Sequence, residues 1–303
     1  MELSSIVAMQ VAIVFILIAV GFVLKKAKMI DDNGSKQLTN ILLFIVTPCV
    51  LIKSYQTEFR TDLAANILWA AFFTVIIHAV MIVISTLIFR KEPTKSYRIN
   101  IFSAVYSNCG FMAIPLLSAV LPKNGVIYGS AYLAIFNILY WTHGVCLYTG
   151  SRKSLSLKNA FLNPGVIGTI LSLVLFVGRV ELPRIIFEPV NYLAGLNTPL
   201  AMIVLGVYLA NIDFKKTLKK ISIYLVALLR LIVFPVIAII ISRVMRLDGD
   251  VAKAVLISAA CPPATVATLF AAKFGLDAGY ASEMVSVSTV LSIITIPMVM
   301  LLA

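Results

Sequence analysis

The amino-acid sequence predicts an all-α polytopic membrane protein with ten transmembrane helices in two inverted repeats of five. Three observations lead to this fold class. Apolar residues make up 61% of the 303 residues and charged residues only 13%, with a mean hydropathy of +1.02, whereas a soluble domain carries roughly 25% charged residues. The apolar residues lie in runs of the length that crosses a bilayer. The basic residues lie mainly between these runs, as they do in loops at a membrane surface.

Ten apolar runs have spanning length, roughly 17 to 27 residues each. The first five form the first repeat, within 1–150, and the last five form the second repeat, within 160–303. The connections between runs are short and leave no room for a soluble domain. We expect transmembrane helices at 6–24, 38–54, 63–89, 99–120, 126–149, 164–180, 190–211, 221–243, 251–272 and 281–302.

Basic residues predict the orientation of the chain. The first run is followed by Lys25 and Lys26, whereas a cleaved signal peptide carries its basic residues before a shorter apolar core. If the first loop is cytoplasmic, that side holds roughly twice as many Lys and Arg residues as the other side. We therefore expect a multi-pass plasma-membrane protein with both termini extracellular. The same clustering argues against nucleic-acid binding, despite a net charge of +12.

Runs two and seven carry matching interruptions, and so do runs four and nine. Run two contains NILLFIVTP (40–48) and run seven contains NYLAGLNTP (191–199), with Asn and Thr-Pro at the same spacing. Run four contains SAVYSNCGFMAIP and run nine contains SAACPPATVATLF. The paired runs lie five helices apart, and an odd number of helices per half inserts the second half upside down. This pattern predicts an inverted-topology repeat.

Runs three and eight carry polar residues at corresponding places, His78 and Arg230. A buried arginine requires a partner, and two interpretations of Arg230 are open. It supplies positive potential for an anionic substrate, or it pairs with backbone carbonyls. For His78 a packing role is favoured over a role as a proton relay.

Run four is interrupted in its middle. Pro115 has no N–H, so the carbonyl of Phe111 loses its helical partner. Gly110 weakens the run further, and the side chain of Asn108 offers two donors and an acceptor. Exposed backbone at this depth is tolerated only where it is buried in protein or lines a cavity. We expect Asn108, Gly110 and Pro115 to form half of a substrate-binding site.

Run five presents polar and aromatic residues on one helix face, namely Asn137, Tyr140 and Trp141. We expect this face to form a cavity wall that includes Asn137 and Tyr140. The alternative is that the aromatic residues are simply interfacial anchors.

Run nine contains a double proline that frees the carbonyls of the preceding turn. The half-helix that follows begins with backbone N–H groups, which favour an anion. We expect Pro263, Ala264 and Thr265 to form the other half of the substrate-binding site.

Run ten carries several hydroxyl side chains, which often bond to carbonyls of their own helix. No acidic residue lies in the middle of any run, so proton symport through a central carboxylate is not indicated. No cofactor is predicted, and the coupling ion, Na+ or H+, is left open. The four cysteines show no CxxC spacing, so neither a zinc site nor a disulfide framework is predicted.

Several of these stretches resemble motifs of the auxin efflux carrier family. SNCGFMAIPLL (107–117) is similar to the family's fourth-helix motif, and the segment 262–299 is similar to its ninth and tenth helices. NILYWT (137–142) and NPGVIG (163–168) also fit. The resemblance covers nearly the whole chain. Ala113 stands where the motif has its second Gly, and the long central loop of many plant members is absent.

The resemblance implies a fold and a mechanism. It implies that helices four and nine are broken and cross at the substrate site, and that transport proceeds by an elevator-like movement. It also implies that helices 1, 2, 6 and 7 form a scaffold, often dimeric, and that helices 3–5 and 8–10 form the moving domain. The family includes plant auxin exporters and bacterial permeases for malate, malonate and similar acids.

We therefore expect a secondary transporter of a small organic anion, a carboxylate, that lies in the lipid bilayer as a homodimer. One alternative is a uniporter or channel-like facilitator that uses the same crossing. A more remote alternative is an intramembrane enzyme, which needs an HExxH motif or paired mid-span carboxylates. With neither present, we expect no catalytic residues and no resident metal.

Overall fold

A computed structural model describes residues 3–91, 95–151, 161–211, 220–247 and 249–302. These residues form helices without a strand, apart from one isolated bridge described below. The helices, in chain order, are α1 (Leu3–Lys26), α2 (Asp32–Ile41), α3 (Thr47–Tyr55), α4 (Thr61–Phe89), α5 (Ser96–Val105), α6 (Ile114–Val120), α7 (Gly125–Leu139), α8 (Val145–Thr149), α10 (Pro164–Val177), α11 (Arg184–Gly195), α12 (Asn197–Leu209), α14 (Ile221–Leu228), α15 (Phe234–Val244), α16 (Gly249–Ala260), α17 (Val266–Lys273) and α18 (Ala278–Leu302). Wide π-type turns join several of them: η1 (Leu42–Val46), η2 (Cys109–Ala113), η3 (Tyr140–Gly144) and η5 (Leu229–Val233).

Six of the described helical stretches are long and apolar enough to cross a membrane by length and composition. They are Met9–Lys26, Asp32–Tyr55, Thr61–Phe89, Arg184–Leu209, Ile221–Val244 and Ala278–Leu302. Two shorter apolar helices are Cys109–Val120 and Pro164–Val177. The all-helical class and the membrane location predicted from composition are thus confirmed in their coarse form.

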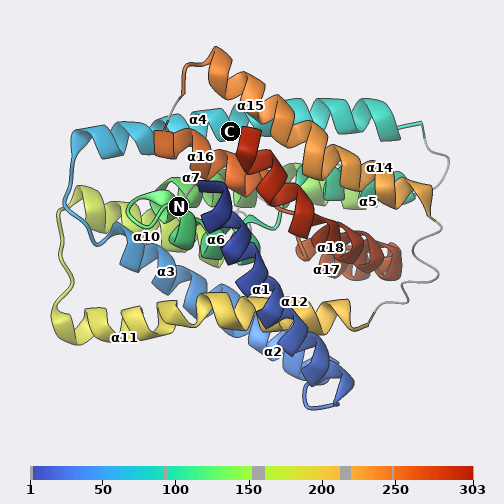
Figure 1. The fold of residues 1–303 in the computed structure, drawn as a ribbon, viewed down its shortest axis with the longest axis horizontal. Coiled ribbons are helices and arrows are strands. Elements are labelled where there is room, and N and C mark those ends of the chain that lie inside the picture. The colour runs from blue at the N-terminus through green and yellow to red at the C-terminus, as the bar shows by residue number, and fades with distance from the viewer. Residues whose placement is uncertain (1–2, 92–94, 152–160, 212–219, 248, 303) are drawn as a thin grey trace.

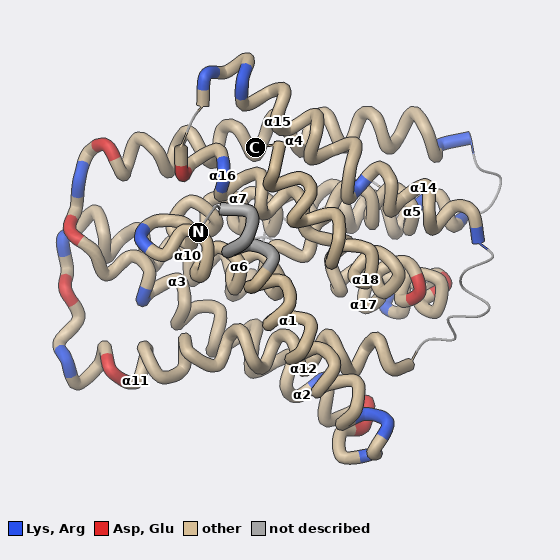
Figure 2. Tube along the Cα trace, viewed as in Figure 1, with Lys and Arg blue, Asp and Glu red and all other residues tan. Residues whose placement is uncertain are grey.

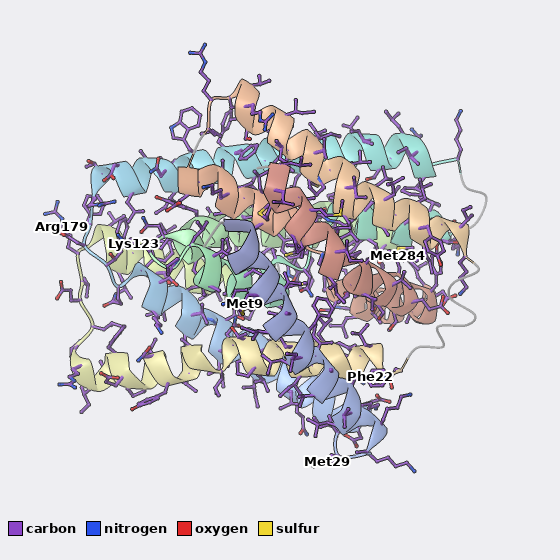
Figure 3. The ribbon with its side chains drawn as sticks, viewed as in Figure 1. Met9, Phe22, Met29, Lys123, Arg179 and Met284 are labelled. Carbon is purple, nitrogen blue, oxygen red and sulfur yellow. The ribbon has the colours of Figure 1, made fainter. Side chains whose placement is uncertain are left out.

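Charged residues gather toward the two ends of the helix array, and the central band is mostly uncharged (Figure 2). Lys123 and Arg179 lie toward the left end of the view, whereas Met29, in the first loop, lies at the bottom (Figure 3). The start of α1 and the end of α18 lie near the middle of the view (Figure 1). The basic clusters at 152–158 and 215–219, which entered the prediction of orientation, lie outside the described residues.

The helices pack as two neighbouring sets. In the first set, α1 packs against α12, and α3 packs against α10 and α11. In the second set, α4 packs against α5 and α7, α16 packs against α7, and α18 packs against α14 and α17. The first set occupies the lower part of Figure 1 and most of the second set the upper part. Contacts of α10 with α7, of α3 with α7 and of α1 with α18 join the two sets.

Wide turns precede three prolines at the same spacing. The turns η1, η2 and η5 are each followed, at the second residue beyond, by Pro48, Pro115 and Pro235. A proline has no N–H to donate, and its ring clashes with the carbonyl four residues earlier. A widened turn accommodates both effects without ending the helix. Pro115 therefore does not break its helix, contrary to the expectation from sequence.

The break in run four lies ahead of this proline. Helix α5 ends at Val105, and the next helical stretch begins at Cys109, so the interruption covers Tyr106–Asn108. In run nine the interruption covers 261–265, between α16 and α17, and includes both prolines as predicted. Helix α11 begins at Arg184, earlier than the expected start at 190.

Candidate functional site

The two interrupted helices meet where each leaves helical geometry. Ser107 and Pro263 form an isolated antiparallel bridge. The amide of Asn108 donates to the carbonyl of Pro262 over 2.7 Å, and the amide of Ala264 donates to the carbonyl of Tyr106 over 2.8 Å. These two hydrogen bonds satisfy backbone groups that the breaks leave without helical partners. We call this bridged region, 106–108 and 261–265, the crossing.

Arg230 covers the carboxyl ends of the two helices that enter the crossing. Its side chain is fully buried on η5. At the end of α5, its Nη1 donates to the carbonyls of Ala104 over 3.2 Å and Val105 over 2.8 Å. At the end of α16, its Nε donates to the carbonyl of Cys261 over 3.1 Å, and its Nη2 donates to that of Ala259. One guanidinium thus neutralises the negative ends of two helix dipoles.

The helices that leave the crossing begin on its other side, with positive dipole ends. Asn108 precedes the stretch Cys109–Val120, and Thr265 precedes α17. Neither side chain caps its own helix. Asn108 is 4% exposed, and its Nδ2 has no hydrogen-bond partner within the described part of the chain. A buried amide donor without a partner is unfavourable by about 1–3 kcal/mol, so an acceptor on a ligand that reached this group would relieve that cost.

A cavity of about 510 Å³ opens beside the crossing. This volume falls within the range of small-molecule sites. Its walls come from the crossing itself, from α7 and η3, from α17, and from the two helical stretches α2–η1–α3 and α10 of the first set. The lining residues are Thr39, Leu43, Phe44, Thr47, Ser107, Asn108, Gly110, Phe111, Leu133, Phe136, Asn137, Tyr140, Trp141, Leu162, Asn163, Pro164, Gly165, Ala264, Thr265, Val266, Leu269, Phe270 and Lys273.

The lining is mostly apolar and carries a positive charge. Lys273 is basic, and none of the described lining residues is acidic. Three lining side chains have a buried polar atom without a hydrogen-bond partner among the described residues: Thr47 Oγ1, Asn108 Nδ2 and Trp141 Nε1. All three groups can donate a hydrogen bond. The cavity is therefore suited to a largely apolar molecule that carries oxygen acceptors or a negative charge.

Six of the nine site residues predicted from the sequence line this cavity: Asn108, Gly110, Asn137, Tyr140, Ala264 and Thr265. Pro263 lies in the bridge, and Pro115 lies inside the helix beyond the wide turn; neither lines the cavity. Arg230 is also outside the lining, and its guanidinium bonds to carbonyls, as one of its two sequence interpretations expects.

Asn137 and Tyr140 already have partners. The Nδ2 of Asn137 donates to the carbonyl of Leu133 over 2.8 Å in its own helix. The hydroxyl of Tyr140 accepts from Nδ2 of Asn163 over 2.9 Å, and Asn163 Oδ1 accepts from the amide of Gly165 over 2.9 Å. Asn163 thereby caps α10 and joins it to η3. Both residues shape the wall, and the free donors belong to Asn108, Trp141 and Thr47 instead.

Thr47, Asn163 and Lys273 line the cavity but were not predicted as site residues. Asn163 begins the NPGVIG motif, which the family resemblance had singled out. Lys273 follows the motif of run nine, and its charge alone predicts a loop residue. Thr47 belongs to the Thr-Pro of run two, which the sequence indicates as part of the repeat and a helix kink, not as a binding residue.

His78 lies behind the crossing, away from the cavity lining. It is fully buried on α4, and its Nδ1 lies 2.9 Å from the carbonyl of Thr74. Its ring packs against Tyr132, with 5.0 Å between centroids, and against Tyr106 at 6.2 Å. These contacts fit the packing role that its sequence context favours.

The fold is an array of helices long enough to span a membrane, and two interrupted helices meet in it beside a mostly apolar cavity with a few hydrogen-bond donors. This combination defines a membrane transporter. The chain belongs to the family described as membrane transport protein, whose sequence model matches residues 6–300. This is the auxin efflux carrier family that the motifs indicate.

Two archaeal relatives extend this assignment. An uncharacterized transporter of Methanothermobacter thermautotrophicus is 24% identical over 293 residues, covering 94% of each chain. An uncharacterized transporter of Methanocaldococcus jannaschii is 24% identical over 302 residues, covering 94% of this chain and 95% of its own. The names of the family and of these relatives indicate transport rather than catalysis.

Proposed function

We propose that the protein is a secondary transporter of a small organic anion, a carboxylate, which binds in the cavity beside the crossing. The asymmetry of the crossing carries this proposal. Arg230 occupies the negative helix ends, whereas the positive ends and the free Nδ2 of Asn108 lie on the side of the cavity. An anion is the ligand that complements such an arrangement.

The physical argument concerns lost hydration. A carboxylate that enters an apolar cavity must exchange its water for donors, because an unpaired buried charge is strongly unfavourable. The lining supplies the amide of Asn108, the hydroxyl of Thr47, the indole N–H of Trp141 and the ammonium of Lys273. None of the described lining residues is acidic, so an anion meets no repulsion there.

The division of the cavity wall supports an elevator-like mechanism. The stretches α2–η1–α3 and α10 supply one wall, and the crossing with α7 and α17 supplies the other. A movement of the second set of helices past the first would carry the crossing with its ligand. In this proposal, α1, α2–α3, α10 and α11–α12 form the scaffold, the remaining helices form the moving domain, and the halves 1–150 and 160–303 are inverted repeats.

Assembly, orientation and coupling complete the proposal. A homodimer would form through the scaffold helices in the plasma membrane, with both termini extracellular. The mass of the protein in lipid nanodiscs tests the dimer, since a monomer mass would contradict it. Coupling to Na+ or H+ is tested by uptake with imposed gradients of each ion, and a channel-like facilitator would show no dependence on either.

Uptake into proteoliposomes tests the central proposal. Purified protein is reconstituted and assayed with radiolabelled phenylacetate, benzoate, succinate and malate, and with the neutral amide phenylacetamide as the control. We expect saturable uptake of at least one acid above that of protein-free liposomes, and no uptake of the amide above that background. Uptake that never saturates, or that does not distinguish an acid from its amide, would contradict a binding site for anions.

A further inference from the structure

Among the described residues that line the cavity, one is charged, and it lies at the C-terminal end of α17. Lys273 is the last residue of that helix and is exposed. Its Nζ lies 5.7 Å from the ring centroid of Trp141 and 5.7 Å from that of Phe274. Among the described residues it forms no salt bridge with an acidic side chain. The ammonium thus rests on aromatic faces and remains available to an anion.

The indole beneath this ammonium has an unused donor. Trp141 Nε1 is buried and has no hydrogen-bond partner in the described part of the chain. The neighbouring Tyr140 hydroxyl interacts with it but does not meet the geometry of a hydrogen bond. Trp141 and Lys273 therefore present a directional N–H and a positive charge in adjacent positions, which together match a carboxylate.

This pair is separate from the donors at the crossing. Helix α17 has 8 residues and runs from Val266, beside the crossing, to Lys273. At about 1.5 Å per residue, its two ends lie about 10 Å apart along the axis. The ammonium of Lys273 rests on the rings of Trp141 and Phe274, away from the backbone at the start of α17.

A continuous aromatic surface joins the two places. The ring centroid of Phe270 lies 5.3 Å from that of Trp141 and 5.5 Å from that of Tyr140, and Tyr140 lies 5.1 Å from Phe136. All four residues line the cavity. An apolar body attached to a carboxylate would stay in contact with these rings between the outer and the inner position.

We propose that Lys273 and Trp141 form an outer carboxylate-binding pair at the rim of the cavity, which captures the acid group of an amphipathic organic anion before Asn108 does. This inference rests on the proposed function, because it assigns a further specificity-determining site to the same cavity. An exposed charge at the rim raises the association rate of an anion, an effect that salt weakens.

Equilibrium binding to the purified full chain tests the pair, with radiolabelled phenylacetate and phenylacetamide as probes. Lys273→Gln should raise the Kd of phenylacetate about 3- to 10-fold at low salt, a difference that narrows at high salt. The Kd of phenylacetamide should not change. Trp141→Phe keeps a ring but removes the N–H and should also weaken binding of the acid, whereas Lys273→Arg should retain most of it.

Lys26 supplies the matched control. Its Nζ lies 5.5 Å from the ring centroid of Phe22, the same kind of contact, but it does not line the cavity. Lys26→Gln should leave the Kd of phenylacetate unchanged. The proposal of an outer pair is overturned if the Lys273→Gln protein binds phenylacetate as tightly as the wild type does. It is also overturned if the substitution raises the Kd of phenylacetate and that of phenylacetamide equally.

Asn108→Ala separates this inference from the proposed function. If Asn108→Ala weakens phenylacetate binding and Lys273→Gln does not, the cavity is an anion site and only the outer pair is wrong. If the wild-type chain binds none of phenylacetate, benzoate and malate, the proposed function fails and the outer pair fails with it.

Discussion

Gly206 on α12 lies directly against Gly21 on α1. A Cβ atom added to Gly206 would stand 2.9 Å from the Cα of Gly21 and 2.7 Å from the amide nitrogen of Phe22, and it would overlap the carbonyl oxygen of Ile18. Gly21 is also close to the backbone of α12, because a Cβ on Gly21 would stand 2.8 Å from the Cα of Ile203. Small residues at such contacts let membrane helices approach closely.

Replacing Gly206 by Val should therefore destabilise the fold. The new side chain meets backbone atoms, which cannot move aside as a flexible side chain can, and overpacking of this kind typically costs about 1–3 kcal/mol. We expect a lower melting temperature in detergent, measured by the fluorescence of a thiol-reactive or intrinsic probe. Gly195→Ala is the control, because a Cβ there meets nothing within 4 Å. Equal melting temperatures for both variants would contradict the close contact.

Asn108→Ala should weaken binding of the transported anion by about 10- to 100-fold. Hydrogen bonds to charged groups contribute roughly 1.5–3 kcal/mol, and 1.4 kcal/mol is a factor of ten. The measurement is the Kd of whichever acid gives saturable uptake. Asn197→Ala is the matched control, because Asn197 is also buried with an unpartnered side-chain atom but does not line the cavity. Similar losses in both variants would indicate a general packing defect.

Arg230→Gln should lower stability more than it lowers the affinity for an anion. Gln cannot reach all the carbonyls that Arg230 now serves at the ends of α5 and α16, and each buried group left unpartnered is unfavourable by about 1–3 kcal/mol. Arg243→Gln is the control, because Arg243 also donates to a carbonyl, that of Leu302 over 3.0 Å, but at an exposed position. A stable Arg230→Gln protein that no longer binds anions would instead favour direct substrate contact.

Cysteine labelling tests the orientation. Cysteines introduced at Lys95 and at Glu181 are exposed to a membrane-impermeant thiol reagent in intact cells, with the unsubstituted chain, which has four native cysteines, as background. If the termini are extracellular, Glu181→Cys should react and Lys95→Cys should react only after the cells are opened. The reverse pattern would contradict the orientation that the basic residues predict.

The crossing could be predicted from the sequence because its residues are unfavourable inside a membrane helix. The double proline of run nine and Asn108 in an apolar run each require an explanation, and both lie at the bridge. Pro115 misled the placement of the first break, because a wide turn accommodates a proline without ending the helix. No local pattern in the sequence distinguishes a proline inside a widened turn from one at a true break.

The partners of individual side chains could not be predicted. Arg230 lies far along the chain from Val105, and only the fold brings its guanidinium to that carbonyl. Lys273 reads as a loop charge because periodicity does not show that α17 ends at the rim of a cavity. Thr47 could not be predicted as a lining residue either. It reaches the opposite wall of the cavity through the packing of α3, which no local sequence pattern shows.

Arg230 also fixes the spacing between the two halves of the crossing. Its guanidinium holds the ends of α5 and α16 together from behind, and two backbone hydrogen bonds hold the bridge in front. In the proposed transporter, these contacts would hold one side of the cavity at a constant width. The opposite wall, where Phe44 of η1 and Leu162 just before α10 are exposed, would then decide the size of molecule that fits. Substitutions on that wall would retune the range of accepted molecules while leaving the recognition of the acid group intact.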